Sequence, residues 1–199
     1  MLKKFLILLL LLLAPQLCFA KIILVLGDSL SAGYGIEVSK GWVTLLQQHI
    51  PKEWQVINAS TSGDTTQNGL NKLPSLLTKH HPDIIIVELG GNDGLRGLSL
   101  TKMSNNLTKI IRLAKASGSK TLLVGVPMFP NYGEVFIKRF GQVYTQVAAN
   151  ENVPLISNVL ANIADQQRFM QNDGIHPNQI AQEKILSNIM RELTPMLAQ

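Results

Sequence analysis

Three residues are the clearest candidates for catalysis: a serine near the start of the chain, and an acid and a histidine near its end. Ser29 lies in the segment 27–30, which directly follows the apolar run 22–26, and Asp173 and His176 lie three positions apart. A serine hydroxyl is a poor nucleophile at neutral pH, so it needs an imidazole to take its proton and a carboxylate to orient that imidazole. If the fold brings these three residues together, the sequence predicts an acyl-transfer enzyme.

Each of these residues also has a plainer interpretation. Ser29 after a strand can simply cap the next helix, and Asp173 can favour a helix entry through the helix dipole. We interpret Asp28 as a structural residue that holds the turn by accepting backbone amides. The catalytic interpretation therefore depends on the order and placement of all the motifs together.

Short apolar or β-branched runs alternate with longer segments of helical period, which predicts an α/β domain with helices on both faces of a parallel sheet. We expect a three-layer α/β/α sandwich with five strands, at 22–26, 55–59, 84–89, 121–126 and 154–156. One helix is predicted over 101–117, with a buried stripe at Met103, Leu107, Ile110, Ile111 and Ala114. The last helix should begin near Pro177 and bury Ile180, Ala181, Ile185, Ile189 and Leu193.

The polar motifs follow the expected strands. In open parallel sheets, ligands bind outside the carboxyl ends of the strands, where the loops leaving those ends converge. The loops in question contain the segments 27–29, 62–64, 90–93 and 173–176. We therefore expect four separate loops to form one cleft.

In order along the chain, Gly-Asp-Ser-Leu at 27–30, Gly63, Gly-Gly-Asn-Asp at 90–93 and Asp-x-x-His at 173–176 resemble the blocks of the SGNH, or GDSL, hydrolase family. The wider run 87–97 is similar to its bacterial secreted branch, which includes thioesterase I, lysophospholipase L1 and arylesterases. The resemblance implies a flavodoxin-like fold. It also implies that Ser29 is the nucleophile, His176 the base and Asp173 its orienting carboxylate.

The same resemblance implies an oxyanion hole formed by Ser29, Gly63 and Asn92. The residue types suit this role, because Gly63 lets a backbone amide approach the substrate closely and Asn92 donates hydrogen bonds without carrying a charge. Such donors, fixed in advance, are each worth about 3 kcal/mol to the transition state.

Apolar residues after the third and fourth strands are candidate walls of an acyl-chain groove, with partial core packing as the alternative. The candidates are Leu95, Leu98, Met128 and Phe129. Glycines flank two larger residues in the segment 94–98, which makes this segment a candidate lid.

The resemblance implies acyl-thioester, lysophospholipid and aryl-ester substrates. A carbohydrate O-acetylesterase is the alternative enzyme, although an aromatic content of 6% is low for a sugar site. A binding module on the same fold is the alternative outside enzymes. No cofactor is expected, because no dinucleotide or phosphate-loop motif occurs, and no metal is expected because His49, His80 and His81 lack partners at metal spacing.

Residues 1–20 are predicted to be a signal peptide, with Lys3 and Lys4 before ten apolar residues and small residues up to Ala20. Its removal leaves 21–199 as a single domain without cysteine, since Cys18 is the only one. The net charge then falls from +5 to +3 and is scattered, which argues against nucleic-acid binding. We expect a periplasmic or secreted monomer whose contact with a membrane surface is at most transient.

Overall fold

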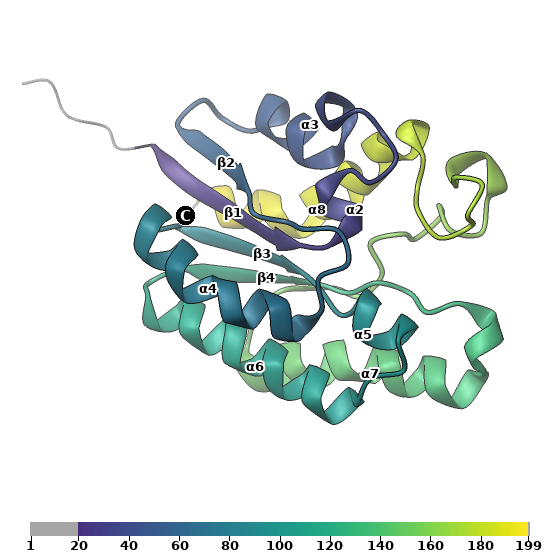
Figure 1. The fold of residues 1–199 in the computed structure, drawn as a ribbon. Helices are drawn as coiled ribbons and strands as arrows, with labels where there is room; N and C mark the ends of the chain where they lie inside the picture. Colours follow the sequence, from purple (N-terminus) through teal and green to yellow (C-terminus); the bar gives the residue numbers. More distant parts are fainter. Residues whose placement is uncertain (1–19, 199) are drawn as a thin grey trace, which may run out of the picture.

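The computed structural model describes residues 20–198, so the predicted leader, Cys18 included, lies outside the described residues except for Ala20. Five parallel strands form one sheet in the order β2-β1-β3-β4-β5 (Figure 1). The strands are β1 (Lys21–Gly27), β2 (Trp54–Asn58), β3 (Ile84–Glu88), β4 (Lys120–Val124) and β5 (Leu155–Ile156). The predicted fold class is confirmed, and the strand boundaries differ from the predicted ones by one or two residues.

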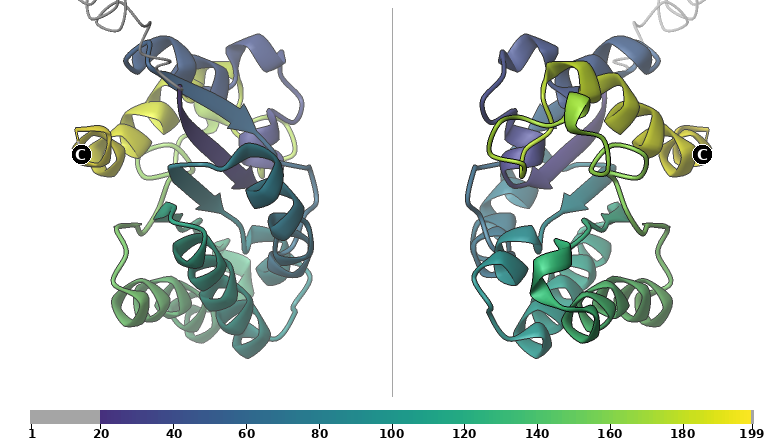
Figure 2. Two further views of the ribbon diagram at one scale, coloured as in Figure 1. Left: turned by 90° about the vertical axis from the view of Figure 1, so that its left-hand side faces the viewer. Right: turned by 90° about the vertical axis from the view of Figure 1, so that its right-hand side faces the viewer.

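Helices cover both faces of this sheet. In Figures 1 and 2, α3 (Trp42–His49) and α8 (Gln182–Leu197) lie on one face, whereas three helices cover the other. Those three are α4 (Thr66–His80), α6 (Leu100–Ala116) and α7 (Glu134–Glu151). The short helices α2 (Ser29–Ala32) and α5 (Gly91–Leu95) follow the carboxyl ends of β1 and β3. Three-residue 3-10 helices complete the described elements: η1 (Val38–Lys40), η2 (Pro130–Tyr132), η3 (Gln167–Phe169) and η4 (Gln179–Ala181).

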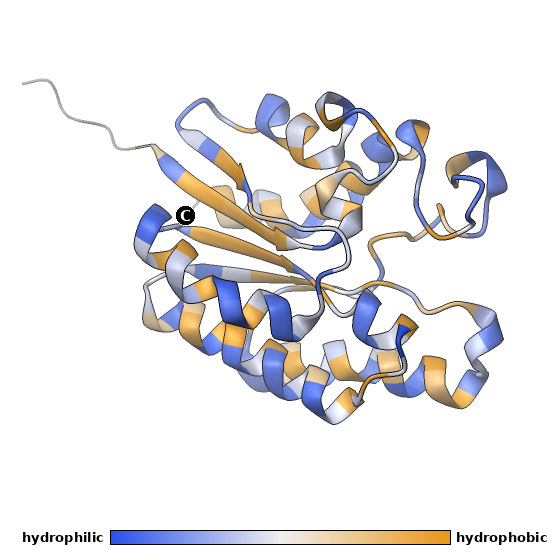
Figure 3. Cartoon of the chain, in the orientation of Figure 1, coloured by the Kyte–Doolittle hydropathy of each residue, from blue (hydrophilic) through white to orange (hydrophobic). Residues whose placement is uncertain are grey.

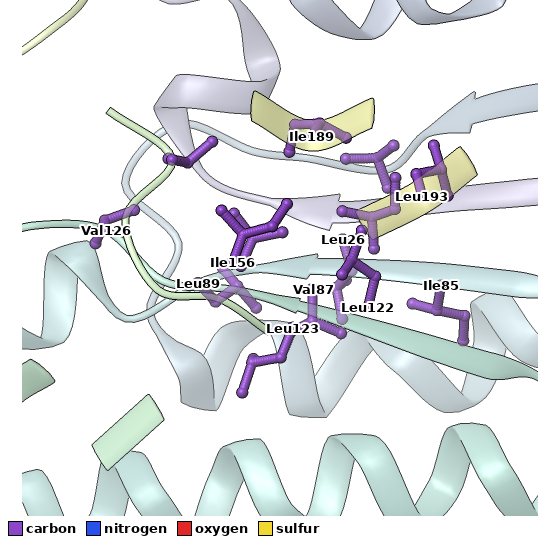
Figure 4. Close-up of a cluster of buried hydrophobic side chains, with 14 of the residues drawn as sticks. Leu26, Ile85, Val87, Leu89, Leu122, Leu123, Val126, Ile156, Ile189 and Leu193 are labelled. Atoms are coloured by element: carbon purple, nitrogen blue, oxygen red, sulfur yellow. The ribbon is translucent and has the colours of Figure 1, made fainter. Parts of the chain in front are cut away.

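The core lies on both sides of the central strands. Their sequences are apolar almost without interruption, as strands covered on both faces require, and Figure 3 shows them as the most hydrophobic part of the chain. Leu26 of β1 and Leu123 of β4 are both in register with Val87 of β3, so they point to the same face of the sheet, the one covered by α4. Figure 4 shows Ile189 and Leu193 of α8 on the other face. Each such fully buried side chain contributes about 1.5–3 kcal/mol, so packing holds the strand ends, and the loops after them, in place.

The predicted helix over 101–117 is observed one residue earlier, as α6, and its predicted apolar stripe is buried. The predicted start of the last helix, near Pro177, was wrong. Asn178 instead caps η4, and α8 begins only at Gln182. This changes the phase of the first turn, so Ile180 is 71% exposed rather than buried. None of the helices within residues 20–198 has the length and apolar character needed to cross a membrane.

Candidate active site

Ser29, His176 and Asp173 form a hydrogen-bonded relay at the carboxyl edge of the sheet. Ser29 begins α2 directly after β1, and its Oγ lies 2.9 Å from His176 Nε2. The other ring nitrogen of His176, Nδ1, lies 2.7 Å from Asp173 Oδ2. With the proton on Nδ1 donated to the carboxylate, Nε2 can accept the proton of the serine hydroxyl. The geometry is that of a nucleophile, a base and an orienting acid.

The Asp173 carboxylate is fixed by its own loop. Its Oδ1 accepts hydrogen bonds from the backbone amides of Ile175 at 2.9 Å and His176 at 3.0 Å. Desolvation acts to raise the pKa of Asp173, but the hydrogen bonds from the backbone and ring of His176 and from Ile175 outweigh it and lower the pKa to about 2. Asp173 therefore stays ionised and can stabilise a protonated imidazole.

Gly63 lies in a tight turn that approaches the same point. The Asp64 amide donates to the Thr61 carbonyl at 3.1 Å, and Gly63, with φ of +86°, occupies the position of this turn that favours glycine. Two side chains hold the turn from outside: Arg96 Nη2 donates to Gly63 O at 2.9 Å, and Lys72 Nζ pairs with Asp64 Oδ2 at 2.5 Å. The amide of Gly63 is thereby available as a fixed donor.

Asn92 lies in α5, and its side-chain nitrogen has two acceptors. Nδ2 donates to Asp28 Oδ2 at 3.1 Å and to the Asp64 carbonyl at 3.0 Å. The next residue, Asp93, is buried and anchors α5 by accepting from the amide and hydroxyl of Thr66, at 2.8 and 2.6 Å. Asn92 thus joins the turn after β1 to the turn after β2.

Two buried acids lie beneath the serine. Asp28 is 3% exposed and accepts from the Leu30 amide at 3.1 Å. Burial raises the pKa of Asp28 to about 6, although hydrogen bonds from Leu30 and Asn92 and the charge of His176 act in the opposite direction. Glu88, at the end of β3, is fully buried, and burial together with the charge of Asp28 raises its pKa well above 4.5. Sequence reasoning missed Glu88, although an acid inside an apolar run was a visible signal.

A cleft of about 320 Å³ opens between these loops, and Ser29, Gly63, Asn92 and His176 all line it. Its remaining walls are mainly apolar. They include the predicted Leu95, Met128 and Phe129, and also Leu30, Tyr34, Val126, Leu160 and Ile175, which the sequence did not single out. The prediction for Leu98 was wrong: its side chain is 43% exposed and is not among the residues that line the cleft.

Two tyrosines contact residues that line the cleft. The Tyr34 ring lies over the imidazole of His176, with centroids 4.5 Å apart, and so covers one face of the base. Tyr132 Oη donates to the Leu95 carbonyl at 3.0 Å. The segment 94–98 is therefore tied to η2 through Leu95 and to the Gly63 turn through Arg96. Whether this segment moves as a lid stays a prediction.

The other histidines lie apart from the cleft. His80 and His81 are at the end of α4, and the His49 ring contacts the Leu45 carbonyl of its own helix at 2.8 Å. In the part of the chain that the structure describes, no three His, Cys, Asp or Glu side chains are grouped as metal ligands.

Comparisons with known proteins identify the family to which the chain belongs. A family model described as GDSL-like Lipase/Acylhydrolase matches residues 25–184, which include every residue of the relay and of the Gly63 and Asn92 turns. Esterase TesA of Pseudomonas aeruginosa is 44% identical over 190 residues, which cover 94% of this chain and 94% of that protein. Thioesterase 1/protease 1/lysophospholipase L1 of Escherichia coli K12 is 40% identical over 178 residues, 89% of this chain and 86% of that protein. The crystal structure of the psychrotrophic esterase EstA from Pseudoalteromonas sp., inhibited by monoethylphosphonate, matches with a TM-score of 0.84 and 38% identity, covering 90% of this chain and 100% of that one.

Proposed function

Because this chain belongs to the GDSL-like lipase/acylhydrolase family, we propose that it hydrolyses esters and thioesters of fatty acids through an acyl-enzyme on Ser29. The observation that carries the proposal is the relay from Asp173 through His176 to Ser29, with distances of 2.7 and 2.9 Å, beside an apolar cleft. A solvent-exposed helix cap would need neither the histidine nor the cleft.

In the first step, Ser29 Oγ attacks the acyl carbonyl while His176 Nε2 takes the hydroxyl proton. Asp173 stabilises the imidazolium and keeps its ring in the reactive orientation. The carbonyl oxygen becomes negatively charged, and we assign the amides of Ser29 and Gly63 and the Asn92 side chain as its hydrogen-bond donors. His176 then passes its proton to the departing alcohol or thiol, and an ester between Ser29 and the acyl group is left.

In the second step, water enters where the leaving group was. His176 removes a proton from this water, and the resulting nucleophile attacks the acyl-enzyme carbonyl. The same donors stabilise the second intermediate. His176 returns the proton to Ser29 Oγ, which frees the fatty acid and restores the enzyme.

The cleft supports an acyl chain rather than a sugar. Its walls beside the relay are formed mainly by aliphatic side chains and Met128. Within residues 20–198, only Tyr34 and Phe129 add a phenol or phenyl ring to these walls. Apolar walls favour burial of methylene groups, at about 0.8 kcal/mol for each. Two relatives are named as an esterase and as a thioesterase and lysophospholipase, which agrees with an acyl group bound in the cleft and a loosely specified leaving group.

The test is turnover of p-nitrophenyl esters from acetyl to palmitoyl, of acyl-coenzyme A thioesters and of a lysophospholipid. We expect longer chains to exceed acetyl in kcat/KM, and Ser29→Ala to lower turnover by several orders of magnitude without loss of stability. A strong preference for acetyl would favour a carbohydrate O-acetylesterase. Unchanged turnover in Ser29→Ala would end the serine esterase proposal, and absence of any turnover would favour a binding module.

We also propose that the protein acts as a monomer in the periplasm or outside the cell, after cleavage near Ala20. The lysine pair and apolar run at the start of the sequence support the leader. Amino-terminal sequencing of the exported protein and its mass by light scattering test both points. A retained leader or a stable dimer would overturn the corresponding part.

A further inference from the structure

The hydrogen bonds of Asn92 raise a question for the oxyanion hole. A side-chain amide nitrogen has two hydrogens, and the structure gives both of them protein acceptors, Asp28 Oδ2 at 3.1 Å and the Asp64 carbonyl at 3.0 Å. Asn92 can therefore donate to a third oxygen only if it gives up one of these bonds. Which bond is kept decides how the donor is aimed.

The two acceptors are unequal. Asp28 is a buried carboxyl whose other oxygen is held by the Leu30 amide, so its position is fixed by the start of α2. A bond to a carboxylate is about twice as strong as a bond to a neutral acceptor. The Asp64 acceptor is a neutral carbonyl in the turn that contains Gly63, and exchanging it for a negatively charged oxygen of substrate is favourable.

We propose that Asp28 is the positioning residue of Asn92: it retains one hydrogen of the side-chain amide throughout catalysis, while the other passes from the Asp64 carbonyl to the oxyanion. Asp28 touches neither the substrate nor the reacting atoms in this scheme. Its charge acts through Asn92. Because Asp28 is fixed next to Ser29, it holds the Asn92 amide in a fixed orientation relative to the nucleophile. The inference rests on the proposed esterase function and assigns Asp28 a role beyond capping α2.

Capping and positioning can be separated by substitution. Serine at position 28 keeps a short oxygen that can cap the Leu30 amide but has no second oxygen for Asn92. Asparagine at position 28 keeps the shape of the side chain. Its NH₂ group would, however, face either the Leu30 amide or Asn92 Nδ2, and both of these are donors. The matched control is Asp83→Ser: Asp83 also accepts a backbone amide, from Ile22 at 2.7 Å, at the opposite edge of the sheet.

The decisive experiment is a double-mutant cycle between Asp28→Ser and Asn92→Ala, measured with p-nitrophenyl octanoate. We expect Asp28→Ser to lower kcat by about tenfold to a hundredfold, within the range for loss of an oxyanion donor, and to leave KM within about twofold. In the Asn92→Ala background the same substitution should cause almost no further loss. Equal losses in both backgrounds, or no loss in the single variant, would overturn the proposal. If the serine variant does not fold, Asp28→Asn takes its place in the double-mutant cycle, with the same expected result.

A second readout does not depend on turnover. The side-chain amide of Asn92 gives two ¹H–¹⁵N signals, which we expect to shift in Asp28→Ser and to stay in place in Asp83→Ser. Unshifted signals in Asp28→Ser would overturn the positioning role even in an active enzyme. Absence of turnover in the wild type would instead overturn the proposed function, and the spectra would still report on Asp28 and Asn92.

Discussion

Replacing Glu88 by glutamine should change how the stability of the protein depends on pH. The side chain is 1% exposed, and its Oε2 accepts hydrogen bonds from Ser31 Oγ at 2.7 Å and from the Asp28 amide at 3.4 Å. Its Oε1 has no hydrogen-bond partner within residues 20–198. Burial, reinforced by the charge of Asp28, raises the pKa of Glu88 well above 4.5, so the folded protein holds this proton at pH values where the unfolded chain has released it.

Proton linkage gives the sign and the size of the effect. Above pH 4.5 the unfolded chain releases the Glu88 proton while the folded protein retains it, so rising pH favours unfolding. As long as the folded protein retains the proton, each pH unit above 4.5 costs about 1.4 kcal/mol of unfolding free energy. Glutamine has no such proton to lose. Its amide adds a cost for hydrogens that find no acceptor, but this cost does not depend on pH.

Urea unfolding at about pH 5, 6 and 7, followed by the fluorescence of the buried Trp42 and Trp54, measures the difference. The unfolding free energy of Glu88→Gln minus that of the wild type should rise with pH, by at most about 1.4 kcal/mol per pH unit. Exposed Glu183 on α8, changed to glutamine, controls for the chemical substitution. A difference that stays constant with pH would refute the reasoning, because Glu88 would then titrate alike in the folded and unfolded chains.

Phe129→Ala should lower the octanoyl-to-acetyl turnover ratio by about tenfold, while Leu98→Ala should leave it unchanged. Of these two residues, only Phe129 lines the cleft. Equal effects of the two substitutions would contradict Phe129 as a wall of the acyl site. Tyr132→Phe removes the bond to the Leu95 carbonyl and should weaken long-chain turnover more than short-chain turnover, and equal losses would count against a lid at 94–98. Asp173→Asn should lower kcat by about 10⁴-fold. Because the pKa of Asp173 is lowered to about 2, the stability that its carboxylate contributes is present above pH 4 and is lost only as pH falls toward 2, which acid titration by circular dichroism can follow.

Much of the fold follows from local sequence. The segments that form β1 and β3 are apolar almost without interruption, which only strands covered on both faces can be. Once the sheet is parallel, the loops after its strands must meet at one edge. The approach of Ser29 to His176 could be expected from that rule, although the 2.9 Å distance between their atoms could not.

The errors arise where a position depends on contacts between distant segments. Ile180 was assigned to a helix face because Pro177 suits a first turn, but Asn178 caps a 3-10 helix there and changes the phase. Leu98 is expected in the groove because it lies in the loop after the third strand, but its side chain is 43% exposed in the structure. No local pattern marks Tyr34 as the ring that covers His176. These features depend on how loops from different strands pack.

Covalent labelling with a fluorophosphonate probe, mapped by mass spectrometry, tests the central claim most directly, because the probe reacts only with an activated nucleophile. We expect a single adduct on Ser29, greatly slowed labelling in His176→Ala, and none in Ser29→Ala. An adduct on another residue, or labelling that persists in Ser29→Ala, would contradict the assignment of Ser29 as the nucleophile.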